Sequence, residues 1–358
     1  MKKKKILFFI PQLSGGGAEK VSITLMKMLD KNIFEVHMAT ITLDGLAYRY
    51  LSNDIVLHDL NVKKTIFSIF KLRNLILSLE PDIIYSSLIR GSIAITLALL
   101  NLKEKPFVVL RSPNSPKLLV GNKQMKFYER YLLEFSYKKA NLLLAQTPEM
   151  KEEISFYHKI EKNKIQVLLN PLDIEGVENN IKDITNPFEN DFVNIVAAGR
   201  ITYQKGFDIL IRSFRQVVEK NPLFRLYIIG EEEGNEIEKL KMLITELKLN
   251  EYVFFLGYQK NAYRYFYFSD LYVLSSRWEG LPNTVLENLY LKKPVIATRC
   301  IPFMDSLIEN GKNGFLVEVE NVDELAKAIL DYKNLRLEFS MFKDSTVEIN
   351  NLFKSLEV

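Results

Sequence analysis

Cysteine and histidine are scarce in this sequence, which excludes several classes of protein. Its 358 residues include one cysteine, Cys300, and three histidines. A lone cysteine has no partner for a disulfide within the chain, so a disulfide scaffold is excluded and we expect a reducing, cytoplasmic compartment. No Asp-x-Asp motif occurs, and no His, Cys and Asp residues stand at the spacing of a metal site. We therefore expect no metal and no cofactor.

Long apolar runs are also missing. The longest, around residues 93–100, is far shorter than the roughly 20 residues of a membrane-spanning helix. Residues 2–5 are lysines and residues 6–10 are apolar, which imitates a signal peptide. That apolar stretch is shorter than the roughly 7–15 residues of a signal-peptide core, and no small-residue cleavage site follows it. We predict a buried first strand here instead.

The overall composition has the ordinary balance of a folded protein. Apolar residues make up 47% and charged residues 26% of the chain, and its length predicts two or three domains of roughly 100–200 residues each. Residues 1–187 carry 27 Lys and Arg against 19 Asp and Glu, whereas residues 188–358 carry 21 against 25. The basic half suggests an anionic partner such as phosphates or membrane headgroups, and solubility alone explains it about as well.

Short apolar runs alternate with amphipathic stretches along the chain, the pattern of a parallel sheet connected by helices. The expected strands are residues 5–10, 35–41, 55–57, 83–85, 107–110, 142–145 and 165–168, then 192–198, 226–229, 253–256, 271–274, 295–297 and 315–317. Between the two sets, residues 170–190 are rich in Asn, Asp, Glu and Pro, which predicts a linker. The sequence therefore predicts an α/β protein of two Rossmann-like domains, residues 1–172 and 173–339.

A glycine-rich loop follows the first expected strand. Gly15, Gly16 and Gly17 precede an amphipathic stretch that continues to Leu29. Glycines let a ligand approach the backbone, and free N–H groups at a helix start attract phosphate. The spacing matches neither a dinucleotide fingerprint nor a Walker loop. A phosphate site and a plain tight turn both remain open for this loop.

Two further loops follow strands of the second half. After residues 192–198 the sequence reads Gly-Arg-Ile-Thr-Tyr-Gln-Lys-Gly. Ligands of open α/β sheets bind at the carboxyl ends of strands, so Arg200 and Lys205 would converge on a diphosphate there. Solvated surface cations are the alternative. In the next loop Gly230 could offer a backbone contact, while we expect the three carboxylates at 231–233 to be solvated.

The most informative segment is residues 275–287, Ser-Ser-Arg-Trp-Glu-Gly-Leu-Pro-Asn-Thr-Val-Leu-Glu. Pro282 suits the first turn of a helix that continues to Leu291, which places Glu279 in the loop and Glu287 inside the helix. Amides at 283–285 would be unpaired helix-start donors for a phosphate, and the two carboxylates can accept hydrogen bonds from hydroxyls. This combination indicates a site for a sugar nucleotide.

These motifs together resemble the retaining GT-B glycosyltransferases, specifically family 4, the glycosyl transferases group 1 type. The resemblance covers nearly the whole chain and rests on the Glu279/Glu287 pair, on Gly199-Arg200 with Lys205-Gly206, on the glycine loop with Ala18-Glu19, and on Asn313-Gly314-Phe315-Leu316-Val317. It implies the GT-B fold, in which two Rossmann-like domains face each other across a cleft. It also implies that the last helix, about residues 340–358, crosses back to the N-terminal domain.

The resemblance also implies roles for individual residues. Glu287 would hold the ribose hydroxyls, Glu279 the donor sugar, and Arg200 and Lys205 the diphosphate, which makes Arg200, Lys205 and Glu279 the catalytic candidates. The remaining donor-binding candidates are Gly16, Gly17, Gly230, Gly280, Leu281, Pro282, Asn283 and Thr284. With no metal, stabilisation of the leaving group falls to the two cations and the helix amides.

One position departs from the family pattern. Many members have a histidine after the strand that corresponds to residues 107–110, facing the donor sugar, whereas here the loop reads Arg-Ser-Pro-Asn-Ser-Pro. We expect Arg111, Ser112 or Asn114 to take over part of that contact in the acceptor or sugar pocket. The three histidines, at positions 37, 58 and 158, are expected to be structural or exposed.

Two basic stretches suggest contact with a membrane surface. Residues 63–79 combine Lys and Arg with Ile66, Phe67, Ile69 and Phe70, and residues 111–139 combine seven cations with an apolar segment at 118–120. Basic helices with apolar flanks can lie in the headgroup region. Helices packed on a sheet with an ordinary charged outer face are the alternative.

The expected function is retaining transfer of a hexose or N-acetylhexosamine from a nucleoside diphosphate donor, with UDP as the nucleotide. The expected acceptor is a polyprenyl diphosphate-linked or other membrane-associated glycan in surface polysaccharide assembly. We expect the protein at the inner face of the cytoplasmic membrane, without a nucleic-acid partner. A sugar-nucleotide epimerase of the same fold and a non-catalytic glycan-binding protein are the alternatives.

Overall fold

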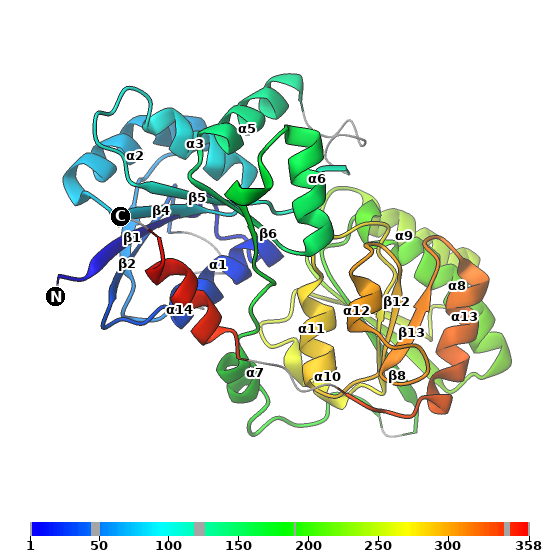
Figure 1. Ribbon diagram of the computed structural model, residues 1–358. Coiled ribbons are helices and arrows are strands. Elements are labelled where there is room, and N and C mark those ends of the chain that lie inside the picture. The colour runs from blue at the N-terminus through cyan, green and yellow to red at the C-terminus, as the bar shows by residue number, and fades with distance from the viewer. Residues whose placement is uncertain (1, 44–50, 118–125, 190, 340–343, 357–358) are drawn as a thin grey trace. The chain divides into compact units, whose positions relative to one another are not determined.

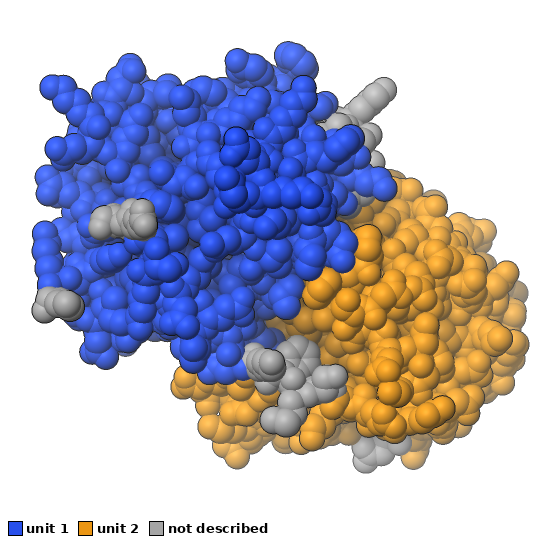
Figure 2. Space-filling view, viewed as in Figure 1, with its two compact units in different colours: residues 1–172, 344–358 blue, residues 173–343 orange. Residues whose placement is uncertain are grey.

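The computed structural model describes residues 2–43, 51–117, 126–189, 191–339 and 344–356. The chain divides into two compact units, each with its own parallel sheet (Figures 1 and 2). Unit 1 comprises Met1–Leu172 and Asp344–Val358, and unit 2 comprises Asp173–Lys343.

Unit 1 contains a seven-stranded sheet in the order β3-β2-β1-β4-β5-β6-β7. Its strands are β1 (Lys4–Phe9), β2 (Phe34–Thr40), β3 (Val56–Asp59), β4 (Ile83–Ser86), β5 (Phe107–Arg111), β6 (Leu142–Ala145) and β7 (Ile165–Val167). The six-stranded sheet of unit 2 has the order β10-β9-β8-β11-β12-β13. Its strands are β8 (Val193–Ala198), β9 (Phe224–Ile229), β10 (Val253–Gly257), β11 (Leu271–Leu274), β12 (Val295–Thr298) and β13 (Gly314–Val317). All thirteen predicted strands are present, and the predicted α/β class is confirmed.

Helices cover both faces of the first sheet. On one face lie α1 (Gly17–Met28) and α14 (Thr346–Lys354), whose apolar residues share a core with Phe8 and Tyr85. The other face packs against α2 (Thr65–Leu79), α3 (Ile89–Ala98), α5 (Phe127–Lys139) and α6 (Pro148–His158), while a short 3-10 turn, η2 (Lys162–Lys164), precedes β7. In Figure 1, α2, α3, α5 and α6 lie on the side of the sheet away from α1 and α14.

The helix at the end of the chain belongs to unit 1. Ile349 and Phe353 of α14 are fully buried in the core beneath α1. The Asn350 side chain accepts a hydrogen bond from the Asp30 amide and donates one to the Met28 carbonyl, both at 2.8 Å, which closes the C-terminal end of α1. The expected return of the last helix to the N-terminal domain is therefore confirmed.

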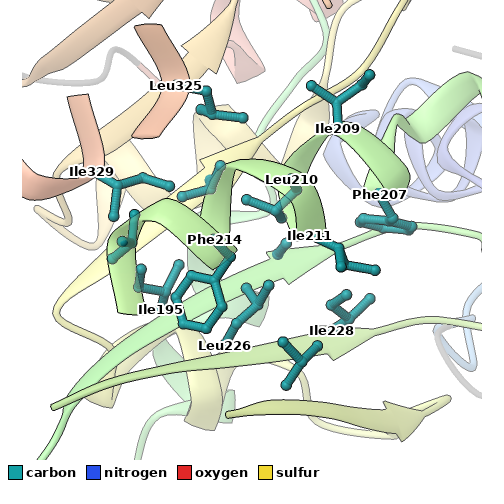
Figure 3. Packing of buried hydrophobic residues seen from close by; sticks show 14 of the residues in the cluster. Ile195, Phe207, Ile209, Leu210, Ile211, Phe214, Leu226, Ile228, Leu325 and Ile329 are labelled. Atoms are coloured by element: carbon teal, nitrogen blue, oxygen red, sulfur yellow. The ribbon is translucent and has the colours of Figure 1, made fainter. Parts of the chain in front are cut away.

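Unit 2 has the same layered construction. One face of its sheet packs against α8 (Phe207–Lys220), α9 (Glu236–Glu246) and α13 (Val322–Leu330), with Phe214 and Ile329 fully buried (Figure 3). The other face packs against α10 (Tyr263–Phe268), α11 (Asn283–Tyr290) and α12 (Met304–Leu307). Unit 2 also contains two 3-10 turns, η3 (Tyr203–Lys205) and η4 (Asp331–Asn334).

The segment predicted as a linker is not an irregular connection throughout. It contains a helix, α7 (Ile174–Asn180), which begins where the Asp173 side chain accepts a hydrogen bond from the Gly176 amide at 3.0 Å. Val177 is fully buried, and the Asn180 carbonyl accepts a hydrogen bond from Asn261 at 2.7 Å. The polar composition of residues 170–190 concealed this helix, because one buried apolar residue is too weak a periodic signal to reveal it.

Both sheets have a switch point, where the order of the strands reverses. In unit 1 it lies between β1 and β4, and in unit 2 it lies between β8 and β11. At such a point the loops leaving two neighbouring strands turn toward opposite faces of the sheet, which leaves a crevice at their carboxyl ends. A ligand site is therefore expected among the loops that follow β1 and β4, or among those that follow β8 and β11.

Candidate functional site

A lysine and a glutamate meet at the switch point of unit 2. Lys205, in the turn after β8, donates a hydrogen bond from Nζ to Oε1 of Glu279, in the loop after β11, at 2.6 Å. Ser276 Oγ donates to the same oxygen at 2.6 Å. The side chains of Lys205 and Glu279 are 19% and 10% exposed, so this ion pair is largely shielded from water. Two of the three catalytic candidates are therefore in direct contact.

Hydrogen bonds between the two loops hold this pair in place. Ser275 Oγ donates to the Lys205 carbonyl at 2.9 Å, and Gln204 Nε2 donates to the Trp278 carbonyl at 2.9 Å. Gly206 has a φ of +62°, and a Cβ there would lie 2.1 Å from the Ser275 carbonyl oxygen. Only glycine allows the loops to approach this closely, which explains the Lys-Gly pair in the motif.

Arg277 joins the same loops from the outer side. Its guanidinium makes two hydrogen bonds to Asp208, at 2.9 and 2.8 Å, and one to Glu320, at 2.7 Å. It also lies over the Tyr203 ring, 3.7 Å from the centroid. Burial alone would lower the pKa of Arg277, but the bonds to the two carboxylates raise it above its usual value. Arg277 therefore fixes the loop that carries Glu279, a role that our sequence analysis missed although the residue stands inside the motif.

Glu287 lies in the middle of α11 and is 3% exposed. The helix begins after Pro282, as the sequence predicted within one residue, and Thr284 Oγ1 accepts a hydrogen bond from Tyr272 at 2.7 Å. The Val285 amide donates to the Pro282 carbonyl at 3.1 Å. The expectation that all amides at 283–285 are unpaired is therefore wrong for Val285. Gly280, Leu281 and Pro282 form the buried approach to this helix, and Asn283 is half-buried at its start.

Arg200 points to a different carboxylate. Its Nη1 contacts Glu233 Oε2 at 3.0 Å, and both side chains are more than half exposed. Arg200 and Lys205 therefore pair with different carboxylates, Glu233 and Glu279. The three glutamates at 231–233 are exposed, as expected.

Gly230 has a packing role in this structure. A Cβ on Gly230 would lie 1.8 Å from the Gly199 carbonyl oxygen, so a side chain here would push apart the loops that follow β8 and β9. The glycine is thus required by neighbouring backbone, in addition to any contact with a ligand.

The glycine loop of unit 1 is closed by its own glutamate. Glu19 Oε2 accepts hydrogen bonds from the amides of Gly15 and Gly16, at 2.6 and 3.2 Å, and Oε1 accepts one from Ser14 Oγ at 2.8 Å. The carboxylate thus occupies the position in which a phosphate was expected. The amide of Gly16 is therefore engaged within the loop, as in a tight turn, and Gly17 is the first residue of α1.

Arg111 lies in the core of unit 1. It is 2% exposed, and its Nη2 donates to the Leu168 carbonyl at 2.8 Å and to Asn170 Oδ1 at 2.7 Å. Its Nη1 has no partner among the described residues, and burial lowers the pKa of the guanidinium. Arg111 was expected to line a pocket, but its side chain turns inward from the end of β5 and is enclosed.

The other two pocket candidates stay near the end of β5. Ser112 is 1% exposed and its Oγ donates to the Asn114 carbonyl at 2.9 Å, whereas Asn114 itself is half-buried. Gln146 donates to the carbonyls of Ser112 and Pro113, both at 2.8 Å. The side chains of Ser112 and Gln146 therefore hold the loop through its backbone carbonyls, and Asn114 is its more accessible polar side chain.

The three histidines have structural surroundings. Each lies in unit 1, where His37 bonds to His58 at 3.0 Å and to Glu35 at 2.9 Å. His158 is buried against the Tyr137 ring, and burial lowers its pKa to about 4. Their expected structural placement agrees with these contacts.

The described ranges contain neither a metal-type cluster nor a membrane-spanning helix. Within residues 2–43, 51–117, 126–189, 191–339 and 344–356, no three His, Cys, Asp or Glu side chains gather as a metal site requires. In the same ranges, no helix combines the length and the apolar character needed to span a bilayer. Of the basic stretch at 111–139, residues 118–125 lie outside the described part of the chain, including the apolar segment 118–120 and Lys123.

Comparison with known proteins connects this geometry to a family. A model described as "Glycosyl transferases group 1" matches residues 178–343, and one described as "Glycosyltransferase Family 4" matches residues 15–175. The chain is 34% identical over 246 residues to the uncharacterized glycosyltransferase MJ1059 of Methanocaldococcus jannaschii. That alignment covers 64% of this chain and 59% of that protein.

Two further likenesses extend over nearly the whole chain. The N-acetylgalactosamine-N,N'-diacetylbacillosaminyl-diphospho-undecaprenol 4-alpha-N-acetylgalactosaminyltransferase of Campylobacter jejuni is 27% identical over 347 residues, which cover 93% of this chain and 92% of that protein. The crystal structure of Anabaena Alr3699/HepE in complex with UDP-glucose matches with a TM-score of 0.78 and 20% identity, over 98% of each chain. The second likeness concerns the fold alone.

Proposed function

The chain is a GT-B glycosyltransferase of the group 1 type, and from this premise we propose that it transfers a sugar from a UDP-sugar to a lipid-linked or other membrane-associated glycan with retention of configuration. The observation that carries the proposal is the contact of Lys205 with Glu279 at the switch point of unit 2. A largely buried cation and carboxylate at this position can serve a diphosphate and a sugar side by side.

Lys205 is the residue that stabilises the leaving diphosphate. Its ammonium has three N–H donors, of which the bond to Glu279 uses one, so phosphate oxygens can engage the others. Because both side chains are shielded from water, the cation acts on developing negative charge more strongly than an exposed lysine would. Arg200, exposed beside Glu233, supplies a second cation once it leaves that partner.

Glu279 and Glu287 hold the hydroxyl groups of the donor. Two donors, Lys205 and Ser276, fix Glu279 Oε1, which orients the carboxylate before a sugar arrives. Glu287 lies in α11, the helix that follows the Glu279 loop. The family resemblance implies that it binds the ribose hydroxyls. Hydrogen bonding is the work we propose for both carboxylates, with no covalent intermediate on either.

Retention then follows from attack on the same face of the sugar. The acceptor hydroxyl forms its bond to the anomeric carbon as the bond to the diphosphate breaks, and its proton passes to the departing phosphate oxygen. Ser112 and Asn114 are poor bases at neutral pH, which favours this route over one through a side-chain base. The 4-alpha linkage in the name of the Campylobacter relative is consistent with retention from an alpha-linked UDP-sugar.

The identity of the donor is tested by thermal shift with a panel of nucleoside diphosphate sugars. A ligand at 100 times its dissociation constant stabilises the native state by about 2.7 kcal/mol, so a UDP-sugar should raise the unfolding temperature while GDP- and ADP-sugars should not. A response to a non-UDP donor alone would contradict the choice of nucleotide. Incubation of the donor without acceptor separates an epimerase, which would yield an isomerised sugar nucleotide.

The mechanism is tested with Glu279→Gln and a short-chain prenyl diphosphate-linked acceptor. Glutamine keeps the shape and part of the hydrogen bonding, so the variant should retain measurable transfer, whereas loss of a nucleophile should abolish it. NMR of the product should show the donor's anomeric configuration. An inverted product, or a glycosylated Glu279 peptide found by mass spectrometry, would overturn the proposal. Activity should also persist in EDTA, and a strict requirement for a divalent cation would contradict metal independence.

A further inference from the structure

The outer layer of unit 1 carries an unusual group of exposed aromatic side chains. They belong to the first two turns of α2 and α5, which flank α3 on one face of the sheet. Their exposed fractions are 61% for Phe67, 78% for Phe70, 87% for Phe127, 56% for Tyr128 and 67% for Tyr131. Single exposed apolar residues are ordinary, but several large ones gathered in one layer indicate a contact surface.

The topology places these turns at a defined edge of the sheet. All strands of unit 1 run parallel, so each connecting helix runs back from the carboxyl edge toward the amino edge (Figure 1). The first turns of α2 therefore lie near the carboxyl ends of the strands. Those of α5 also lie toward that edge, since the helix ends at Lys139, shortly before β6 begins at Leu142. The glycine loop after β1 lies at this same edge.

Cations stand at the starts of the helices that carry the aromatic side chains, and acidic groups are few in the same turns. Lys63 and Lys64 precede α2, which contains no Asp or Glu. Lys126 lies 5.9 Å from the centroid of the Tyr128 ring, and Arg90 at the start of α3 is 3.8 Å from Glu129. Glu129 is the acidic residue of the first turn of α5, and it is already engaged with Arg90 and with the amide of Lys126.

Two other cations of the predicted basic stretch are used internally. Lys71 donates to the carbonyls of Leu60 and Asn61, and Arg73 donates to those of Ala98 and Leu100. They tie α2 to its neighbours. The cations around the aromatic group are therefore those at the starts of the helices, and not the whole basic stretch.

We propose that Phe67, Phe70, Phe127, Tyr128 and Tyr131, with the cations at the starts of α2, α3 and α5, form a docking surface for an anionic phospholipid bilayer. This aromatic–basic surface deepens the proposed function, on which it rests, by assigning the membrane contact to particular side chains. Aromatic rings favour the interface between headgroups and acyl chains, and Lys and Arg pair with lipid phosphates. The surface would hold the carboxyl edge of unit 1 close to the bilayer in which a lipid-linked acceptor resides.

The test is co-sedimentation of the full chain with vesicles of phosphatidylcholine containing phosphatidylglycerol, without donor or acceptor. The triple variant Phe67→Ser/Phe70→Ser/Phe127→Ser should bind at least tenfold more weakly than the unmodified chain, since each ring withdrawn from the interface is a large apolar side chain returned to water. Circular dichroism should be unchanged, because all three side chains are exposed.

Phe156→Ser is the matched control. Phe156 is 77% exposed in the same layer, but it stands near the end of α6 and so toward the amino edge. Binding of this control should stay within about twofold of the unmodified chain. Equal losses in the control and the triple variant would overturn the placement of the surface, and unchanged binding of the triple variant would overturn the surface itself.

Lipid composition and salt separate the two contributions. Binding should weaken on vesicles of phosphatidylcholine alone and as salt rises, because exposed charge attraction fades when the Debye length falls below about 10 Å. Wholly salt-insensitive binding would contradict the role of the cations. A protein partner for this surface would leave the chain unbound to every vesicle, which also contradicts the proposal.

Failure of this inference differs from failure of the proposed function. Transfer to a short-chain soluble acceptor reports on the site in unit 2, and vesicle binding reports on the aromatic–basic surface. Intact transfer without vesicle binding overturns the docking surface alone. Vesicle binding without any transfer to soluble or lipid-linked acceptors overturns the function and leaves the surface.

Discussion

At the switch point of the first sheet the chain satisfies its own polar groups, whereas at that of the second sheet it presents charged ones. In unit 1, Ser22 and Ser87 bond to each other at 2.6 Å beneath the start of α1, and Ser86 donates to the Phe9 carbonyl at 2.9 Å. The carboxylate of Glu19 closes the glycine loop above them. In unit 2, the corresponding crevice holds the ion pair of Lys205 and Glu279.

This difference shows that the same strand topology can carry a self-bonded switch point in one sheet and a charged one in the other. Both sheets reverse their strand order at the equivalent place, so the fold offers a crevice in each unit and the side chains decide its use. Neutral hydroxyls that bond to each other have little to offer a diphosphate. A lysine held by one hydrogen bond retains donors for phosphate oxygens, which is why we assign the donor to unit 2.

The largest expected effect comes from removing a charge at the switch point of unit 2. Lys205→Ala should lower turnover by about 10² to 10³-fold, because the leaving diphosphate loses a preorganised cation. Steady-state kinetics with the preferred UDP-sugar measure this, with Lys220→Ala, an exposed lysine at the end of α8, as the control. Arg200→Ala should lower turnover by a factor in the same range. Rates within a factor of two of the unmodified enzyme would remove these residues from the mechanism.

The second prediction concerns the buried cation of unit 1. Arg111→Ala should reduce the free energy of unfolding by about 3 kcal/mol, since it leaves a cavity and takes the donor away from Leu168 and Asn170. Urea unfolding measures the loss, and Arg90→Ala, whose side chain is 70% exposed, serves as the control. If the variant kept its stability but had a raised KM for the acceptor, Arg111 would be a binding residue and not a structural one.

A third test uses pH to separate the two units, because the histidines all lie in unit 1. The pKa of His158 falls from about 6.5 in the unfolded chain to about 4 in the native state. Its contribution to stability is complete above pH 6.5 and is lost as the pH falls toward 4, with about 2 kcal/mol lost by pH 5.

Urea unfolding at pH 7 and pH 5 measures this loss by circular dichroism, while fluorescence of Trp278 reports on unit 2. His158→Gln should make the stability of unit 1 less dependent on pH. If unit 2 lost as much stability as unit 1 over this range, the buried histidine would not be the cause.

The smallest effect concerns the self-closed glycine loop. Glu19→Gln should lower stability by about 1 kcal/mol, because a neutral amide oxygen accepts more weakly from Gly15 and Gly16 than a carboxylate does. Donor turnover should stay within about twofold, as measured alongside thermal unfolding. A large fall in the donor's KM would show instead that the glutamate competes with a phosphate for these amides.

Much of the fold could be predicted because of how parallel sheets are built. Strands buried on both faces appear as short apolar runs, and the helices between them repeat the pattern of a covered sheet. The exception, α7, has a single buried apolar residue in a polar segment. Its position became visible only through contacts such as that of Asn261 with Asn180.

Prediction of the candidate site was less uniform. Glu279 and Glu287 stand in a compact motif whose spacing reveals its loop and helix, and Lys205 follows a strand at the edge where ligands bind. Ser276 and Arg277 are in the same segment. The sequence alone does not distinguish a residue that fixes the loop from one that contacts a ligand. Arg111 illustrates the opposite error, since its place after the strand suggested a contact in the acceptor or sugar pocket and only packing shows that it is enclosed.

The sequence by itself determined the two parallel sheets, their helices and the loops in which chemistry could lie, because these depend on apolar periodicity and on glycine and proline at turns. Only the tertiary structure decided which of those loops meet. Lys205 and Glu279 are separated by 74 residues and come together because β8 and β11 are neighbours in the sheet. Arg111 faces inward for the same reason, because its partners Leu168 and Asn170 are 57 and 59 residues away in the chain.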